Sequence, residues 1–232
     1  MTSHSENEDK NFEKFREMYD PDGVHSENAL RKLFYLSDCN PELATECSKK
    51  FFTLWDKTYS NVDSKKVLEE VATKKFVFGG LDEEGRRIVH FYYKMHDPKQ
   101  FALDNTMTMF MEVMDVALDN KDTATKGMIF ICWMRDSGWS NFDLASERYF
   151  TETITSLQPM SLKMMNQMIM VDSPWYVWAA MKLMSPFLTP EIRSKLFMFS
   201  EQELRSKFSP DALKPNNLFL DAVSSDDYTP WK

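Results

Sequence analysis

MIFICWM, residues 128–134, decides the fold, because a strand of this composition has no polar face to turn toward water. Strands that are apolar on both sides belong to parallel sheets whose two faces are covered. One face would take helices, and the other would meet either more helices or an apolar ligand. With Gly127 the run has eight residues, whereas a helix that crosses a membrane needs about 20, so it predicts a buried strand and no membrane span.

The segments around this strand predict a mixed, mainly parallel sheet. Further strands are expected at KKFVFGG (74–80), RRIVHFYY (86–93), MNQMIMV (165–171) and KLFMF (195–199). LDEEG, residues 81–85, reads as the turn of a hairpin between the first two. Helices are expected over 104–118 and around 144–157. Strands that alternate with helices of this length indicate parallel pairing through right-handed crossovers, and the fold class is therefore α/β.

The N-terminal part has a helical period instead. Residues 12–73 predict a small all-helical layer, with helices from 12 to 19, from 27 to 36, from a cap at Asn40 and around 67–71. Residues 74–215 form the sheet-containing part. Residues 1–11 are expected to be disordered, and residues 216–232 to form a C-terminal tail.

Composition excludes several classes of function. The net charge is −8 and the excess acid sits at the two ends of the chain, so nucleic acid is not an expected partner. Three cysteines without CxxC spacing and four scattered histidines predict neither a disulfide framework nor a metal site. No phosphate-binding, hydrolase or zincin motif occurs. We therefore expect no enzyme, no catalytic residue and no cofactor. The N-terminus lacks a secretory signal, which favours the cytoplasm.

Two features of the second half stand out. Only Met1 and Met18 precede residue 95, so 15 of the 17 methionines lie from residue 95 onward, and methionine suits apolar surfaces of variable shape. In WYVWAAMKLM, residues 175–184, the only charge is Lys182. A helix there either is buried in the core or covers something apolar, and its aromatic rings suit a boundary between hydrocarbon and water. An ordinary methionine-rich core and a fully buried helix explain the same patterns equally well.

The polar residues at helix starts give further expectations. Ser173, Thr189 and Ser209 each precede a proline and predict capped helix N-termini. Ser200 and Glu203 have the spacing of a capping box.

The order of these elements resembles the CRAL-TRIO (Sec14-like) lipid-binding proteins, including their tocopherol-transfer relatives. The likeness covers about residues 30–210 and is carried by FGGLDEEGRRIVHFYY, by MIFICWM with a following GWS, and by MIMVDSPWYVWAAMKLMSPFLTPEIRSKLFMF. Its most specific part is VDSPW, then SPFL, then SKL. GGLDEEG and the SPW segment also resemble the N-terminal domain of motile-sperm-domain-containing tethering proteins.

The resemblance implies a sheet that floors an apolar lipid cavity and a gate helix beginning at Pro174. It places Met128, Cys132, Ile154, Leu157, Met165, Met168 and Lys195 as ligand-binding residues. The gate residues are Trp175, Trp178, Met181 and Phe187. Lys163, Arg193 and Lys195 would form a basic rim for an anionic head group. For each lining residue, plain core packing is an equal alternative.

Departures from the family pattern mark a divergent member. SLKM, residues 161–164, replaces YPER, so a lysine stands where phosphatidylinositol-transfer members have glutamate. GRRI replaces GRPV, with Arg87 in place of proline. The expected function is a cytoplasmic, non-enzymatic domain that binds, and transfers or presents, one hydrophobic lipid (a phospholipid, a tocopherol-like molecule or another) during transient peripheral contact with membranes. The alternative is a protein-interaction or membrane-tethering module whose pocket is filled by its own side chains.

Overall fold

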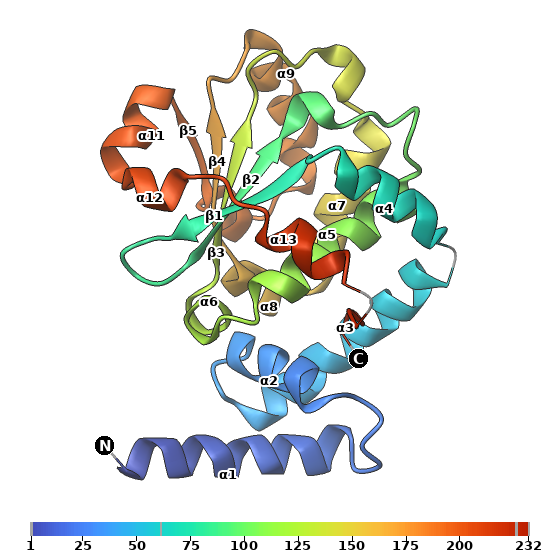
Figure 1. Cartoon of the computed structure of the whole chain (residues 1–232), viewed down its shortest axis with the longest axis vertical. Helices are drawn as coiled ribbons and strands as arrows, with labels where there is room; N and C mark the ends of the chain where they lie inside the picture. The colour runs from blue at the N-terminus through green and yellow to red at the C-terminus, as the bar shows by residue number, and fades with distance from the viewer. Residues whose placement is uncertain (1, 61, 226, 232) are drawn as a thin grey trace.

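A five-stranded sheet forms the centre of the protein (Figure 1). The structure is a computed structural model that describes residues 2–60, 62–225 and 227–231. The strands are β1 (Phe76–Leu81), β2 (Arg87–Tyr92), β3 (Met128–Trp133), β4 (Met165–Val171) and β5 (Leu196–Phe199), and they lie in this order across the sheet. β1 and β2 are antiparallel, and the remaining pairs are parallel. The predicted mixed, mainly parallel sheet is confirmed.

The two faces of the sheet carry different side chains, because successive residues of a strand point to opposite sides. We call one the isoleucine face; it consists of Ile88, Ile129, Ile131, Ile169 and Val171, all fully buried. We call the other the methionine face; it consists of Phe91, Phe130, Cys132, Met168 and Met170. Both faces are apolar, as the composition of MIFICWM requires.

Helices cover both faces. α11 (Glu201–Lys207) and α12 (Pro210–Leu213) pack on the isoleucine face through Leu204 and Leu213 and lie to the left of the sheet in Figure 1. The other side is covered by α5 (Leu103–Ala117), α7 (Leu144–Ser156), α8 (Met160–Met164), α9 (Trp175–Met184) and α10 (Pro190–Arg193). Short connections are η1 (Tyr93–Met95), α6 (Lys121–Lys126), η2 (Trp139–Asn141) and η3 (Ser185–Phe187).

The predicted helical layer comprises α1 (Thr2–Tyr19), α2 (Glu27–Leu36), α3 (Pro41–Tyr59) and α4 (Ser64–Ala72). In Figure 1, α1, α2 and α3 lie below the sheet and α4 lies to its right. The core of the layer is continuous with that of the sheet-containing part, and α2 contacts α6 and α8. In addition, the buried ammonium of Lys32 in α2 lies 2.5 Å from the carboxylate of Asp115 in α5. The layer therefore supports the helices that surround the site.

The predicted capping residues are found at the starts of the helices, with one exception. Asn40, Thr189, Ser209 and the box of Ser200 with Glu203 all make the expected side-chain bonds to backbone N–H groups. Ser173 does not, because α9 begins one residue later than predicted, at Trp175, with Pro174 as its cap. The Ser173 hydroxyl is buried and has no hydrogen-bond partner within the described residues.

The N-terminal segment differs from the prediction, and the C-terminal tail contains a helix. Residues 2–11, expected to be disordered, belong to α1, where the Glu8 carboxylate accepts hydrogen bonds from the Tyr35 hydroxyl (3.0 Å) and the Lys121 ammonium (2.7 Å). In the expected tail, α13 (Leu218–Val223) contacts α5, and the indole N–H of Trp231 donates to the carbonyl of Met111. Contacts with residues far along the chain hold these segments, polar ones at Glu8 and also apolar ones at Phe219 and Trp231, and the hydropathy pattern of one segment does not reveal such contacts.

Candidate functional site

An apolar pocket lies between the methionine face and the helices α5, α7, α9 and α10. Its volume is about 200 Å³. Four predicted ligand-binding residues line it, together with the predicted gate residue Met181: they are Cys132, Ile154, Met165 and Met168. The sheet therefore contributes one wall, and Met165, Met168 and Met170 of β4 lie at that wall.

Two other predicted lining residues lie elsewhere. Met128 is fully buried and Leu157 is 3% exposed, and both pack in the main core outside the pocket lining. Met128 shares a side of β3 with Cys132 but stands at the opposite end of the strand. Periodicity fixes the side of a strand on which a residue lies and says nothing of how far along the strand a cavity extends.

α9 covers the pocket with an apolar inner face and leaves an apolar outer face exposed. Tyr176, Val177, Ala180 and Met184 are buried and line the pocket. On the outer face Trp175 is 75% exposed, Trp178 59% and Leu183 52%. This exposure excludes the fully buried core helix that the sequence left open. Phe187, the fourth predicted gate residue, lies in η3 with the Arg148 guanidinium 5.0 Å from its ring centre.

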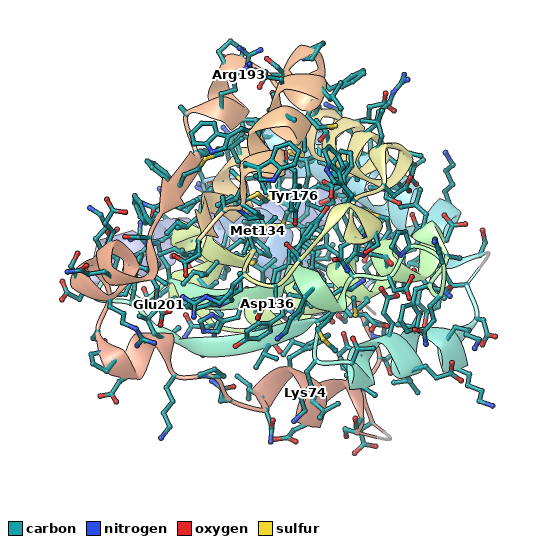
Figure 2. All side chains as sticks on the ribbon, turned by 90° about the horizontal axis from the view of Figure 1, so that it is seen from above. Lys74, Met134, Asp136, Tyr176, Arg193 and Glu201 are labelled. Atoms are coloured by element: carbon teal, nitrogen blue, oxygen red, sulfur yellow. The ribbon has the colours of Figure 1, made fainter. Side chains whose placement is uncertain are left out.

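The N-terminal end of α9 is tied to the loop that follows β3. The Tyr176 hydroxyl lies 2.5 Å from the Ser137 hydroxyl, and Ser137 donates to the carbonyl of Met134. Figure 2 labels Met134 and Tyr176, which also pack in one cluster. In the same region the Arg135 guanidinium contacts the carboxylates of Asp172 (2.5 Å) and Glu201 (2.9 Å). The contact between Tyr176 and Ser137 thus links the start of α9 to the loop after β3, and Arg135 links the same loop to Asp172 and Glu201.

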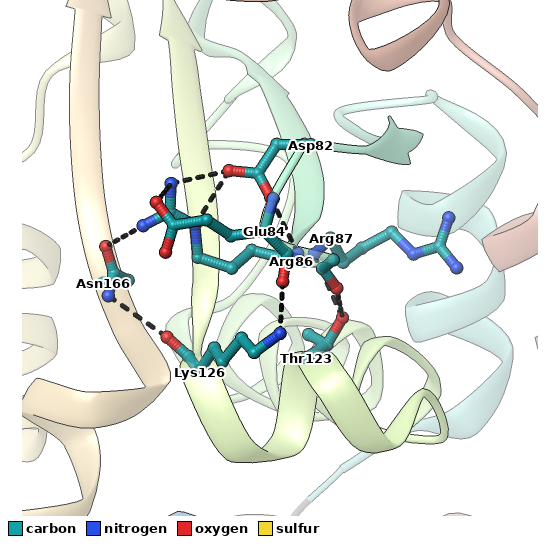
Figure 3. A network of polar contacts seen from close by, with 8 residues as sticks. Asp82, Glu84, Arg86, Arg87, Thr123, Lys126 and Asn166 are labelled. Carbon is teal, nitrogen blue, oxygen red and sulfur yellow. Dashed lines mark hydrogen bonds and ion pairs between the residues drawn. The ribbon is translucent and has the colours of Figure 1, made fainter.

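The start of β4 is fixed by a polar network at the other end of the sheet (Figure 3). The Arg86 guanidinium donates to the Asp82 carboxylate at 2.6 and 2.8 Å and to the Asn166 side-chain oxygen at 3.0 Å. Asn166 donates in turn to the carbonyl of Lys126, whose ammonium contacts the carbonyl of Glu84 at 2.6 Å. The network joins the β1–β2 hairpin, the end of α6 and the start of β4, next to the pocket residue Met165.

The neighbouring Arg87 explains one departure from the family pattern. Its backbone N–H donates to the Thr123 hydroxyl at 3.0 Å, and its guanidinium donates to the carbonyl of Gly79. A proline at this position has no N–H and could make neither bond. GRRI in place of GRPV therefore anchors β2 to α6 in this chain.

The three cations predicted to form a head-group rim have separate partners. Lys163 donates to the carbonyl of Tyr35 (2.6 Å) and contacts the Asp38 carboxylate (2.5 Å), so it joins α8 to the helical layer. The Arg193 guanidinium donates to two backbone carbonyls of the α9–α10 connection, at the outer edge of Figure 2. Lys195 contacts the carbonyl of Asn166 at 3.4 Å, and burial lowers its pKa. None of the three lines the pocket. Each of the three cations therefore makes a separate structural contact, and a shared head-group rim stays a prediction.

A polar pair that the sequence analysis missed lies in the pocket wall. The Tyr93 hydroxyl, from η1, donates to Oε1 of Glu147, from α7, at 2.7 Å. Both residues line the pocket. Burial raises the pKa of Glu147, although the bond from Tyr93 opposes that shift. In the sequence Glu147 has the features of a solvent-facing residue in the first turn of a helix, so no local signal points to it.

Asp143 fixes the position of Glu147. Its carboxylate accepts from the backbone N–H groups of Ala145 (3.3 Å) and Ser146 (3.0 Å) and caps α7, as its place after the GW turn suggests. The cap sets the start of α7, and one turn later the helix presents Glu147 to the pocket.

A second polar group borders the pocket at His96 and Thr106. The Thr106 hydroxyl donates to the Glu70 carboxylate at 2.7 Å, and the buried ammonium of Lys75 contacts both Glu70 and Nδ1 of His96. Burial, reinforced by the charge of Lys75, lowers the pKa of His96 to about 4. Lys75 is thus paired with Glu70, and His96 is neutral at pH 7.

Other features bear on function class. Burial raises the pKa of the Cys132 thiol to about 12, so the thiol in the pocket stays protonated. Within the described ranges we find no group of three or more His, Cys, Asp or Glu residues placed to hold a metal ion. In the same part of the chain, none of the helices has the length and apolar character needed to cross a membrane.

Comparisons with known proteins agree with this architecture. A CRAL-TRIO domain-containing protein of Schizosaccharomyces pombe is 28% identical over 137 residues, which are 59% of this chain and 13% of that protein. Tyrosine-protein phosphatase non-receptor type 9 of Mus musculus is 23% identical over 150 residues, 64% of this chain and 25% of the phosphatase. The chain thus spans a quarter or less of the length of these curated relatives.

Among solved structures, the crystal structure of Sfh5 superimposes with a TM-score of 0.54 at 11% identity, covering 96% of this chain and 98% of that one. At this identity the likeness shows the fold alone. The CRAL/TRIO domain profile matches residues 72–216, more than half of the chain, and that stretch contains the sheet, the pocket wall and α9. The chain therefore belongs to the CRAL/TRIO domain family, as one of its divergent members.

Proposed function

We propose that this domain binds a single hydrophobic lipid in the pocket beneath α9 and presents or transfers it between membranes. The CRAL-TRIO family is a lipid-binding family in general. The observation that carries the proposal for this chain is the pocket itself, which has the methionine face as its floor and the inner face of α9 as its cover. The polar pair of Tyr93 with Glu147 lies in a lining that is otherwise mainly apolar.

Burial of hydrocarbon supplies the affinity. Apolar surface removed from water contributes about 25 cal/mol per Å², so one alkyl chain in the pocket gains several kcal/mol without any polar contact. The pocket is smaller than the roughly 300–1,000 Å³ of common ligand sites. A single chain or a compact ring system therefore suits it better than a two-chain phospholipid, and the flexible side chains of Met168 and Met181 adjust the wall.

α9 acts in this proposal as a movable gate. Its exposed Trp175 and Trp178 present rings of the kind that settle at the boundary between hydrocarbon and water. Contact with a membrane would replace water around these rings and lower the cost of moving α9 away from the pocket. The domain would act from the cytoplasm, with transient peripheral contact and without chemical change of the lipid.

Native mass spectrometry of the full chain, purified without detergent, tests the binding step. The expected result is a 1:1 adduct that organic extraction removes and that can be identified in the extract. Met168→Trp, which fills the pocket, should reduce the adduct. Leu183→Trp, the matched change on the exposed side of α9, should leave it unchanged.

A chain that carries no adduct, and takes up none when offered lipid vesicles, would contradict the proposal. That result would favour the alternative function, a protein-interaction or membrane-tethering module whose pocket holds only its own side chains.

A further inference from the structure

The pair formed by Tyr93 and Glu147 has unused hydrogen-bonding capacity that faces the pocket. Oε1 of Glu147 accepts from the Tyr93 hydroxyl at 2.7 Å. Within the described residues, the second carboxyl oxygen, Oε2, accepts no hydrogen bond. Glu147 lines the pocket, so its carboxyl group is within reach of a ligand that enters the pocket. The carboxyl group therefore has one free position for a polar atom of that ligand.

Among the described residues, no cation is paired with this carboxyl group. The groups that interact with it electrostatically are Tyr93 from η1, Cys132 from β3 and Asp143 at the cap of its own helix, none of which carries positive charge. His96, which also lines the pocket, is neutral at pH 7 because burial lowers its pKa to about 4. Lys75 is paired with Glu70 and lies outside the pocket lining.

The environment therefore favours the uncharged carboxyl group. Burial is the main cause that raises the pKa of Glu147, and the charge of Asp143 acts in the same direction. An uncharged carboxyl group offers one O–H donor besides its acceptor oxygens. A hydroxyl group also both donates and accepts, so it matches this partner without burying a charge.

Charged head groups fit less well. A carboxylate or phosphate would enter an apolar pocket that has no cation in its lining, and an unpaired buried anion is strongly unfavourable. An ammonium group would find a counter-ion only if Glu147 ionised. Desolvation of two charges then offsets most of what their attraction contributes.

We propose that Glu147, held by Tyr93, is a specificity-determining anchor that selects lipids ending in a single uncharged hydroxyl group over lipids of equal length ending in a carboxylate or phosphate. This inference rests on the proposed function, because it assigns the head-group chemistry for the same pocket. The two residues come from segments 54 positions apart, which only the fold brings together.

Competition binding on the full chain tests the proposal. The probes are 1-hexadecanol, hexadecanoate, hexadecylamine and hexadecane, each displacing a fluorescent alkyl probe from the pocket. Wild-type protein should bind the alcohol at least about fivefold more tightly than the alkane, the ratio that corresponds to one hydrogen bond of about 1 kcal/mol. It should bind hexadecanoate more weakly than the alcohol.

Three variants distinguish the loss of the hydrogen bond to the ligand from a loss of folding. Glu147→Leu should lower the affinity for the alcohol about fivefold and leave that for the alkane unchanged. Glu147→Gln, which keeps an uncharged hydrogen-bonding group, should retain most of the affinity for the alcohol. Glu152→Leu is the matched control, because Glu152 lies in the same helix, is exposed and pairs with Arg148. Thermal melting of each variant verifies that it folds.

The outcomes distinguish the two proposals. Equal wild-type affinity for the alcohol, the acid and the alkane would overturn the anchor and leave lipid binding intact. Tightest binding of hexadecylamine, lost in Glu147→Gln, would overturn it in favour of an ionised carboxylate that binds ammonium lipids. Failure of all four probes to bind, although the fluorescent probe itself is held, would also overturn it. If the fluorescent probe does not bind either, the proposed function fails together with the anchor.

Discussion

The isoleucine face and the methionine face are opposite sides of the same strands, and they differ in the shape of their side chains. In adjacent positions of the β3–β4 pair, Ile131 stands opposite Ile169 and Cys132 stands opposite Met170. Branched isoleucine has one strongly preferred rotamer and packs rigidly, whereas unbranched methionine adapts to irregular space. The rigid side packs against α11 and α12, and the adaptable side borders the pocket. Side-chain branching therefore separates the face that packs against helices from the face that borders the pocket.

The largest expected contrast comes from truncating one residue on each face. Ile131→Ala should lower the free energy of unfolding by about 4 kcal/mol, because Ile131 is fully buried and the change leaves a new cavity. Met170→Ala should cost about 2 kcal/mol or less, because Met170 already borders an open space. Urea unfolding of both variants measures the difference. Equal losses would show that the two faces are equally packed and would remove the basis of the comparison.

Acid should destabilise the protein through the buried histidines, one on each side of the sheet. Burial lowers the pKa of His90 to about 4, and the Trp133 indole N–H donates to its Nδ1 at 3.0 Å. A histidine whose folded pKa lies below its unfolded value of 6.5 stabilises the fold above pH 6.5 and loses that contribution as the pH falls to about 4. The loss is about 3 kcal/mol. His90→Gln should therefore show a shallower decline in stability over this range.

Glu112 provides a control, because its contribution to stability depends on pH in the direction opposite to that of His90. Burial and the charge of Asp115 raise its pKa to about 7 from an ordinary value of 4.5. Its protonated form is favoured in the folded state, so its contribution is present at low pH and is lost as the pH rises from 4.5 to about 7. Glu112→Gln should therefore remove this loss of stability between pH 4.5 and about 7. It should leave unchanged the loss of stability that the histidines cause as the pH falls. Identical pH profiles for wild type and both variants would contradict the two assignments.

The sequence predicted the fold because hydrophobic pattern determines it. MNQMIMV forms β4 over the predicted residues, and MIFICWM forms β3 apart from its last residue. The expected disorder is not found for residues 2–11, which belong to α1, and in the C-terminal tail residues 218–223 form a helix. Glu8 and Trp231 make contacts with residues far along the chain. A pattern within one segment contains no information on such distant partners.

The site was only partly predictable for the same reason. Cys132 and Met168 follow from the alternation of two strands, but Met128 shows that alternation does not define the length of a pocket. Tyr93 and Glu147 meet only because η1 and α7 begin at the same wall. The rim prediction treated Lys163 as a free cation, whereas the folded chain pairs it with Asp38. Functional polar groups in this pocket are properties of the tertiary structure.

Substitutions on the buried and the exposed face of α9 should also differ in their effect on stability, by less than those on the two faces of the sheet. Tyr176→Phe removes the contact with Ser137 and should lower the free energy of unfolding by about 1 kcal/mol, with little change in vesicle binding. Trp178→Asp lies on the exposed face, so stability should change by less than about 0.5 kcal/mol. Its binding to phospholipid vesicles should fall, because a charge at the interface opposes insertion. Vesicle sedimentation and thermal melting measure both quantities. Unfolding caused by Trp178→Asp would contradict the gate.

The smallest expected effect compares neighbours on β4 that point to opposite faces. Ile169→Leu keeps the number of atoms but moves the branch into a closely packed layer, which should cost about 1 kcal/mol. Met168→Leu should change stability by less than about 0.5 kcal/mol, because Met168 lies at the pocket wall, where a change of shape meets space rather than packed atoms. Leucine has fewer rotatable bonds, so the same variant should bind a narrower range of chain shapes. Displacement by straight and branched alcohols of equal carbon number measures that range, and urea unfolding measures stability. If Met168→Leu costs as much as Ile169→Leu and leaves ligand preference unchanged, methionine at this wall is ordinary core packing, and adaptability does not distinguish the two faces.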